Sequence, residues 1–188
     1  MSGWIITAVV VAIALYAIFV FNRLVRLRNL AREGWSGIDV QLKRRSDLVP
    51  NLVATVKAYA AHERTVLEEV TASRQSSIAA DDVARRASAE NALGGALGRL
   101  FAVAEAYPQL KADQNFLALQ QQLAEIEDQL QMARRYYNGT VRNLNISIQS
   151  FPDNLLAGVL GFREQPFFEL EDRAQAATPA VAFQAPQP

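Results

Sequence analysis

Residues Trp4 to Phe21 read WIITAVVVAIALYAIFVF, a run of 18 residues without a charge or a helix breaker. At about 1.5 Å per residue, a helix of this length is roughly 27 Å long, close to the ~30 Å hydrocarbon core of a bilayer. Backbone polar groups inside lipid must be satisfied within the segment, and a single span can do this only as a helix. The run therefore predicts one N-terminal transmembrane anchor over residues 1–22.

Two other interpretations of this run fit the sequence less well. A cleaved signal peptide needs a basic n-region, a shorter apolar core and small residues at the cleavage site. Here only Met-Ser-Gly precedes the run, which ends in Phe-Asn-Arg-Leu-Val-Arg. A buried core helix would show one apolar stripe, whereas this run is apolar all the way round.

Charge next to the run predicts its orientation. No Lys or Arg precedes it, whereas four arginines follow it closely: Arg23, Arg26, Arg28 and Arg32. The positive-inside rule then places the N-terminus outside and the rest of the chain in the cytoplasm, as a single-pass protein of the bacterial inner membrane. Each basic residue near an anionic leaflet adds about 1 kcal/mol to this preference, so the lipid bilayer is the first expected partner.

The remainder of the chain reads as long helices. Apolar residues recur every three or four positions from Trp35 to Val70 and again from Phe116 to Phe151, which indicates buried helical stripes. The spacing predicts helices over 35–74, 81–107 with Asp81 or Asp82 as N-cap, and 115–151, and a loop over 73–80. A short apolar helix is expected over 154–162, and residues 169–188 form a tail predicted to be disordered. The fold class is thus all-α, with an antiparallel bundle of long helices over residues 23–168.

Several residues interrupt these patterns. Pro50 predicts either a kink or a restart of the helix with Ser46 or Asp47 as N-cap, and the unbroken register favours the kink. Arg45 and Glu63 fall in the apolar seam, where either each has a partner on another helix or the seam is exposed. Three glycines in the second helix indicate either close approach of a neighbour or a flexible helix: Gly94, Gly95 and Gly98.

The sequence offers no active site, and we expect neither enzymatic activity nor a cofactor. His62-Glu63 resembles the start of a zinc-protease motif, but Val66 stands where the second histidine belongs and the chain has one histidine. Cysteine is absent, which excludes disulfides and Cys-ligated metals. Lys+Arg and Asp+Glu balance at 19 each, and a basic triplet such as Lys43-Arg44-Arg45 is usually a solvated face, so no nucleic-acid partner is expected. Two glycosylation sequons, at Asn138 and Asn145, fall inside a predicted cytoplasmic helix and fit chance.

The segment from Trp35 to Val53, WSGIDVQLKRRSDLVPNLV, resembles the LemA family, and the resemblance continues at Tyr59 and His62-Glu63. Further matches are Tyr107-Pro108-x-Leu110-Lys111-Ala112, Asn115-Phe116-x-x-Leu119-Gln120, Ala133-Arg134-x-Tyr136-Tyr137-Asn138, Phe151-Pro152-x-Asn154 and Gly161-Phe162. Gly34 departs from the alanine usual in the family. The resemblance implies an N-terminal anchor with a cytoplasmic antiparallel bundle, and no reaction. The association of some members with magnetosome membranes suggests a role in membrane organisation.

Helix lengths lead to a prediction about assembly. At ~1.5 Å per residue the three helices measure roughly 60, 40 and 55 Å, so an up-down-up bundle leaves the start of the first helix uncovered. Trp35, Ile38 and Leu42 are apolar there, and we expect a neighbouring subunit to cover them in a homo-oligomer. The leading hypothesis is a self-assembling scaffold that organises or shapes the membrane. The alternative is an adaptor that presents its bundle to a membrane protease or transporter.

Overall fold

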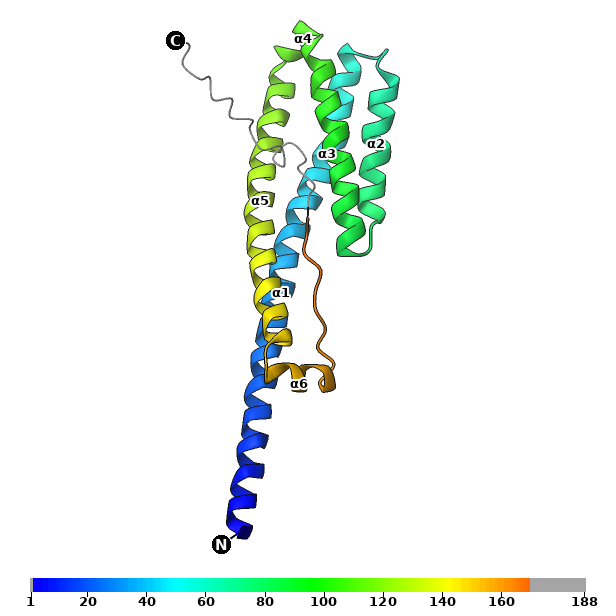
Figure 1. Ribbon diagram of the computed structural model, residues 1–188. Coiled ribbons are helices and arrows are strands. Elements are labelled where there is room, and N and C mark those ends of the chain that lie inside the picture. Colours follow the sequence, from blue (N-terminus) through cyan, green and yellow to red (C-terminus); the bar gives the residue numbers. More distant parts are fainter. Residues whose placement is uncertain (1, 170–188) are drawn as a thin grey trace, which may run out of the picture.

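The computed structural model describes residues 2–169, which are mainly helical with no strand among them (Figure 1). The all-α prediction is confirmed. A long pair, α1 (Ser2–Tyr59) and α5 (Gln114–Gln149), runs antiparallel, and the hairpin of α2 and α3 packs beside its far half (Figure 1). The helices are α1 (Ser2–Tyr59), α2 (Arg64–Ala79), α3 (Val83–Glu105), α4 (Pro108–Lys111), α5 (Gln114–Gln149) and α6 (Asp153–Val159). Most of the predicted tail, residues 170–188, lies outside the described range.

The predicted helix over 35–74 is wrong, because the chain reverses at residues 60–63 and forms two helices. The Ala60 amide still bonds the Val56 carbonyl at 2.8 Å, and the Glu63 amide then closes the turn on the Ala60 carbonyl at 3.1 Å. Ala60 and Leu67 are both buried in one core, so the two arms face the same side. The apolar spacing therefore continues through a reversal as it would through a straight helix.

The loop predicted over 73–80 is also wrong, since α2 continues to Ala79. Two serine hydroxyls of this stretch have hydrogen-bond acceptors. Ser76 donates to the Ala72 carbonyl within the helix, and Ser77 donates to Glu90 of α3. The turn is confined to residues 80–82. Asp82 caps α3 by accepting the Arg85 amide at 2.8 Å, which selects it from the two predicted caps.

Helix α1 runs through Pro50 without ending, so the alternative of a restarted helix, which the register did not favour, does not occur. Proline has no amide hydrogen, which deprives the Ser46 carbonyl of its usual donor four residues on. Arg74 of α2 replaces that donor, with its Nε 2.7 Å from the Ser46 oxygen. The defect in α1 is thus repaired from the neighbouring helix.

Two apolar cores lie one above the other. The far core joins α1, α2, α3 and α5 around side chains such as Val56, Val70 and Leu100. The lower core, at the end from which the apolar run of α1 projects, joins α1, α5 and the C-terminal segment. We call this end the anchor end. Because α5 has 36 residues, or about 54 Å, it reaches from the far end back to the anchor end.

A buried polar layer separates the cores. The Arg45 guanidinium lies 3.1 Å from Glu90 of α3 and 2.9 Å from Glu127 of α5. This confirms that Arg45 needs partners on other helices. Gly94 makes room for it, because a methyl group there would come within 3.3 Å of the Arg45 Nη2, whereas a methyl group at Gly98 would meet no neighbouring side chain or helix within 4 Å.

Candidate functional site

The anchor end is built on α1, which leaves the bundle without a break and projects beyond it (Figure 1). In the described part of the chain this is the one helix long and apolar enough to cross a membrane. Almost none of its apolar window is covered by the rest of the chain, unlike the core helix of a soluble bundle. Its large side chains are instead exposed, from Tyr16 at 38% to Trp4 at 85%.

Asp153, the first residue of α6, ties the C-terminal region to this helix. Its carboxylate accepts the Tyr16 hydroxyl at 2.6 Å and Arg23 Nη1 at 3.1 Å. The Asp153 residue is buried although Arg23 is half exposed, so the charge is screened from solvent but has two donors. A buried carboxylate is tolerated when it is paired and hydrogen-bonded in this way. The contact fixes α6 at the height where the apolar run ends.

Beyond α6 the chain turns back and rises as an extended segment, residues 163–169, along the α1–α5 pair (Figure 1). Two asparagines of α5 hold it through side-chain amides that pair with its backbone. Asn145 bonds both the amide and the carbonyl of Gln165 at 2.9 Å, and Asn138 bonds those of Phe168 at 2.9 and 3.1 Å. Each asparagine side chain of α5 therefore pairs with the backbone of the extended segment in the way that a neighbouring β-strand would.

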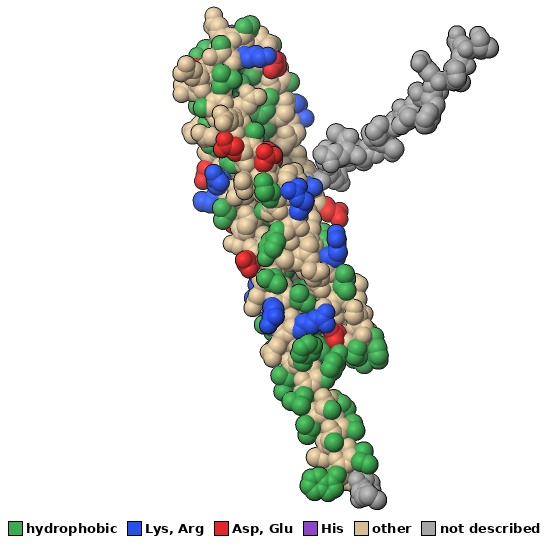
Figure 2. Space-filling model, turned by 90° about the vertical axis from the view of Figure 1, so that its left-hand side faces the viewer, with side chains coloured by type: hydrophobic (Ala, Val, Ile, Leu, Met, Phe, Trp, Pro, Cys, Tyr) green, Lys and Arg blue, Asp and Glu red, His purple; other side chains and the backbone are tan. Residues whose placement is uncertain are grey.

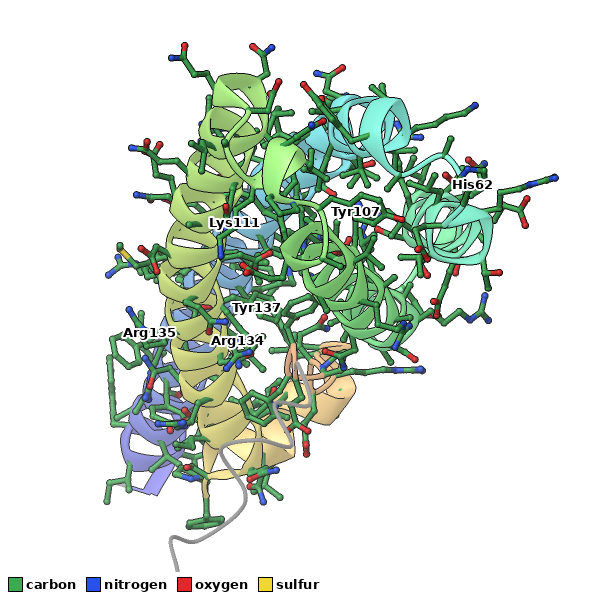
Figure 3. All side chains as sticks on the ribbon, turned by 90° about the horizontal axis from the view of Figure 1, so that it is seen from above. His62, Tyr107, Lys111, Arg134, Arg135 and Tyr137 are labelled. Atoms are coloured by element: carbon green, nitrogen blue, oxygen red, sulfur yellow. The ribbon has the colours of Figure 1, made fainter. Side chains whose placement is uncertain are left out.

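Tyr137 completes this attachment from inside the bundle, toward which its side chain points (Figure 3). Its hydroxyl donates to the Pro166 carbonyl at 2.9 Å, and burial raises the pKa of this hydroxyl above its ordinary value. The Tyr137 ring lies 5.5 Å from that of Trp35, which in turn contacts Phe168 at 5.7 Å. Phe168 is fully buried, so the extended segment is part of the lower core.

This arrangement removes the basis of the predicted oligomer interface. Ile38 and Leu42 are buried within the chain, and Trp35 is half buried against Tyr137 and Phe168. The prediction assumed that the last long helix ends far from the anchor, but α5 descends and covers these side chains itself. Trp35, Ile38 and Leu42 are therefore core residues of the subunit.

The four basic residues after the run differ in their surroundings. Arg26 and Arg32 are exposed, and Arg23 is held by Asp153. Arg28 stacks over the Phe162 ring, 5.1 Å from its centroid, and its buried Nε has no partner among the described residues. Arg28 and Arg32 also line a cavity of about 230 Å³ beside Trp35. Side chains of Lys and Arg lie just above the hydrophobic surface of the projecting end of the molecule (Figure 2).

The polar layer contains two acidic side chains, the fully buried Glu90 and the partly exposed Glu127. Burial raises the pKa of Glu127, while the Arg45 guanidinium lowers it and the Glu90 charge raises it further. Glu63, the other predicted seam charge, lies in the α1–α2 turn and accepts the Tyr107 hydroxyl at 3.1 Å. These contacts join helices, and a cavity of about 370 Å³ lies beside the layer, lined by Ser46, Arg74 and Ser77 among others.

His62 lies in the turn between α1 and α2, exposed and directed away from the bundle (Figure 3). Within residues 2–169 no group of three or more His, Asp or Glu side chains is placed to hold a metal ion. The residues that sequence reasoning missed are Asp153 and the asparagines of α5. The asparagines were visible as polar residues seven apart on an apolar helix, a spacing that places both on one face.

Together these features define a class of protein: an all-α bundle whose first helix extends into an exposed apolar run suited to a membrane. The chain belongs to the LemA family, whose model matches residues 34–183. It is 25% identical to the magnetosome protein MamQ of Magnetospirillum gryphiswaldense, over 87% of this chain and 69% of that protein. Two proteins of Paramagnetospirillum magneticum, magnetosome proteins MamQ 1 and MamQ 2, match to the same extent.

Proposed function

We propose that the protein is a non-enzymatic, membrane-anchored scaffold whose copies assemble side by side and organise or shape the membrane. The observation that carries this proposal is the continuity of α1, whose 58 residues, about 87 Å, join the apolar run to both cores without a hinge. A bundle fixed rigidly to its anchor transmits contacts between neighbours to the membrane below. The similarity to proteins named for magnetosomes supports a role in membrane organisation.

The same proposal places the N-terminus outside the bacterial inner membrane and the bundle in the cytoplasm. This orientation rests on the arginines that follow the run. Of these, Arg26 and Arg32 are exposed and so free to meet lipid headgroups. We propose that self-assembly uses the outward side of α5. Met132, Tyr136 and Ile146 are each about half exposed there. At 100° per residue they lie within one stripe, with Gly139 between them, where an added methyl group would meet no neighbouring side chain or helix within 4 Å.

Cysteine crosslinking tests the scaffold directly, because the native chain has no cysteine. A single Ile146→Cys variant should form a crosslinked homodimer in native membranes. Ser76→Cys, exposed on α2 away from that stripe, should not. Native electrophoresis of mild detergent extracts should then show a homo-oligomer. A discrete complex with another membrane protein would favour the adaptor function instead, and a monomer without crosslinks would refute self-assembly.

Ser76→Cys also reports orientation. In intact cells it should resist a membrane-impermeant thiol reagent and react after the cells are lysed, because the proposed topology places α2 in the cytoplasm. Ready labelling in intact cells would reverse the orientation without affecting the assembly test.

A further inference from the structure

We propose that α6 and its flanks form a second membrane contact, a short helix that lies in the interface of the bilayer leaflet on the bundle side. This inference deepens the proposed function and rests on α1 crossing the membrane. The occupant of the surface is lipid, specifically the boundary between headgroups and acyl chains.

The first observation is an apolar face that nothing in the described chain covers. Phe151 is 80% exposed, Leu155 64% and Val159 86%. Leu155 and Val159 are four residues apart in α6 and so share one side of it, and Phe151 lies in the turn just before the helix. The opposite side carries Asp153 and Ala157, both buried against the bundle. The helix is therefore apolar on the side that faces outward, which is unusual for a surface exposed to water.

The second observation is the height at which α6 is held. Asp153 is bonded to both Tyr16 and Arg23, which lie on either side of the end of the apolar run. At the other end of the segment, the Phe162 ring meets that of Phe21 at 6.0 Å in an edge-to-face contact. Both ends of the segment are thus level with the last residues of the run.

The third observation is direction. The short helix α6 lies across α1 at the anchor end, whereas the long helices run along α1 (Figure 1). A helix that crosses a transmembrane helix at the height where the span ends lies in the plane of the membrane surface. Tyr16 is five residues before Phe21, about 7.5 Å lower along the helix. Interfacial helices bury their apolar face about 5–10 Å into the headgroup and acyl boundary, which matches this depth.

Charge around the segment fits the same position. Arg23 holds Asp153, Arg28 stacks on Phe162, and Arg26 is exposed at the same level. On the face shown in Figure 2, the projecting end of the molecule is covered by hydrophobic side chains, and Lys and Arg side chains lie just above them. An apolar stripe below and basic side chains above are the pattern that an anionic leaflet attracts.

Depth-dependent fluorescence quenching tests this position in the full chain. The two native tryptophans are replaced by Trp4→Phe and Trp35→Phe, and Val159→Trp is introduced. The protein is reconstituted in phosphatidylglycerol/phosphatidylcholine vesicles whose phosphatidylcholine carries bromine either near the top or near the end of its acyl chains. We expect Val159→Trp to lose most of its emission with bromine near the headgroup, less with deep bromine, and little with aqueous iodide.

Two matched variants serve as controls. Val40→Trp, half exposed on α1 about 28 Å beyond Phe21, should be quenched by iodide and not by either bromolipid. Val10→Trp, within the apolar run, should be quenched most strongly by deep bromine. Leu155→Trp repeats the test on the same face, and each variant must keep the far-UV circular dichroism of the parent.

Each outcome decides the proposal. Quenching of Val159→Trp by iodide alone, with Val10→Trp still quenched by lipid, overturns the interfacial helix and leaves the anchor intact. Protection of Val159→Trp from both quenchers means that protein covers the face, which also overturns it. If Val10→Trp is not quenched by lipid either, the proposed membrane anchor itself is wrong.

Discussion

Replacing Arg45 by methionine should be the most damaging conservative change in the bundle. The Arg45 side chain is 6% exposed and its partner Glu90 is fully buried, 3.1 Å away. Removing one member of a buried ion pair leaves the other charge without compensation and costs about 3–5 kcal/mol. Small domains are stable by only about 5–15 kcal/mol, so this loss is a large part of the total. Glu90 keeps its bond from Ser77, which should hold the loss toward the lower end of the range.

The loss should depend on pH because of Glu127. Its pKa is raised by burial, and Arg45 is the group that opposes this rise. Without Arg45 the pKa rises further. A carboxyl whose folded pKa exceeds its unfolded pKa destabilises the fold above the folded pKa, where it is ionised, and this cost fades as the pH falls through it. The Arg45→Met variant should therefore lose less stability at about pH 5 than at about pH 8.

The assay is urea unfolding of the full chain in detergent micelles, followed by far-UV circular dichroism. The double variant Arg45→Met, Glu90→Gln removes the fully buried carboxylate as well and should recover part of the loss, because Glu127 is then the one carboxylate of the layer left without Arg45. The reasoning is refuted if the double variant is no more stable than Arg45→Met alone. If Arg45→Met loses the same stability at both pH values, Glu127 does not contribute to the loss.

Three further changes test the contacts between elements. Asn145→Ala should cost about 1–3 kcal/mol by unpairing the Gln165 backbone, and hydrogen exchange should accelerate at the amides of residues 163–169. Gly98→Ala should stabilise the bundle by about 0.5–1 kcal/mol in urea unfolding, since the site is open, whereas Gly94→Ala should gain less because it crowds Arg45. Arg74→Ala should cost about 1–3 kcal/mol in the parent and clearly less in a Pro50→Ala background, where a backbone N–H returns to the Ser46 carbonyl; equal costs would contradict the proposed repair.

Much of the fold follows from local patterns in the sequence. The apolar run, the length of α5 and the cap at Asp82 each depend on residues within a few turns of one another. The buried position of Arg45 was also predictable, because a charge in an apolar seam must find a partner. The identity of that partner was not, since Glu90 lies 45 residues away on a helix with no distinguishing pattern.

The candidate site depends on contacts that local patterns do not encode. Asn138 and Phe168 are 30 residues apart, and Asp153 and Tyr16 are 137 apart. An asparagine on a helix can cap, bind water or hold another segment, and only the folded chain selects among these roles. The extended segment itself has no helical or strand period, so its place in the lower core is not visible before folding.

The number of chain reversals between α1 and the C-terminal segment decides which residues lie at the anchor end of the bundle. With three long helices after the anchor, the C-terminal segment would end at the far end of the bundle and leave Trp35 uncovered. The turn at residues 60–63 adds one reversal, so that α1 and α3 rise while α2 and α5 descend. As a result, Asp153 lies against Arg23, and Phe162 lies against Phe21. The same turn that makes Trp35 a core residue thus places a second apolar surface beside the candidate anchor, which is the arrangement that the proposed interfacial helix requires.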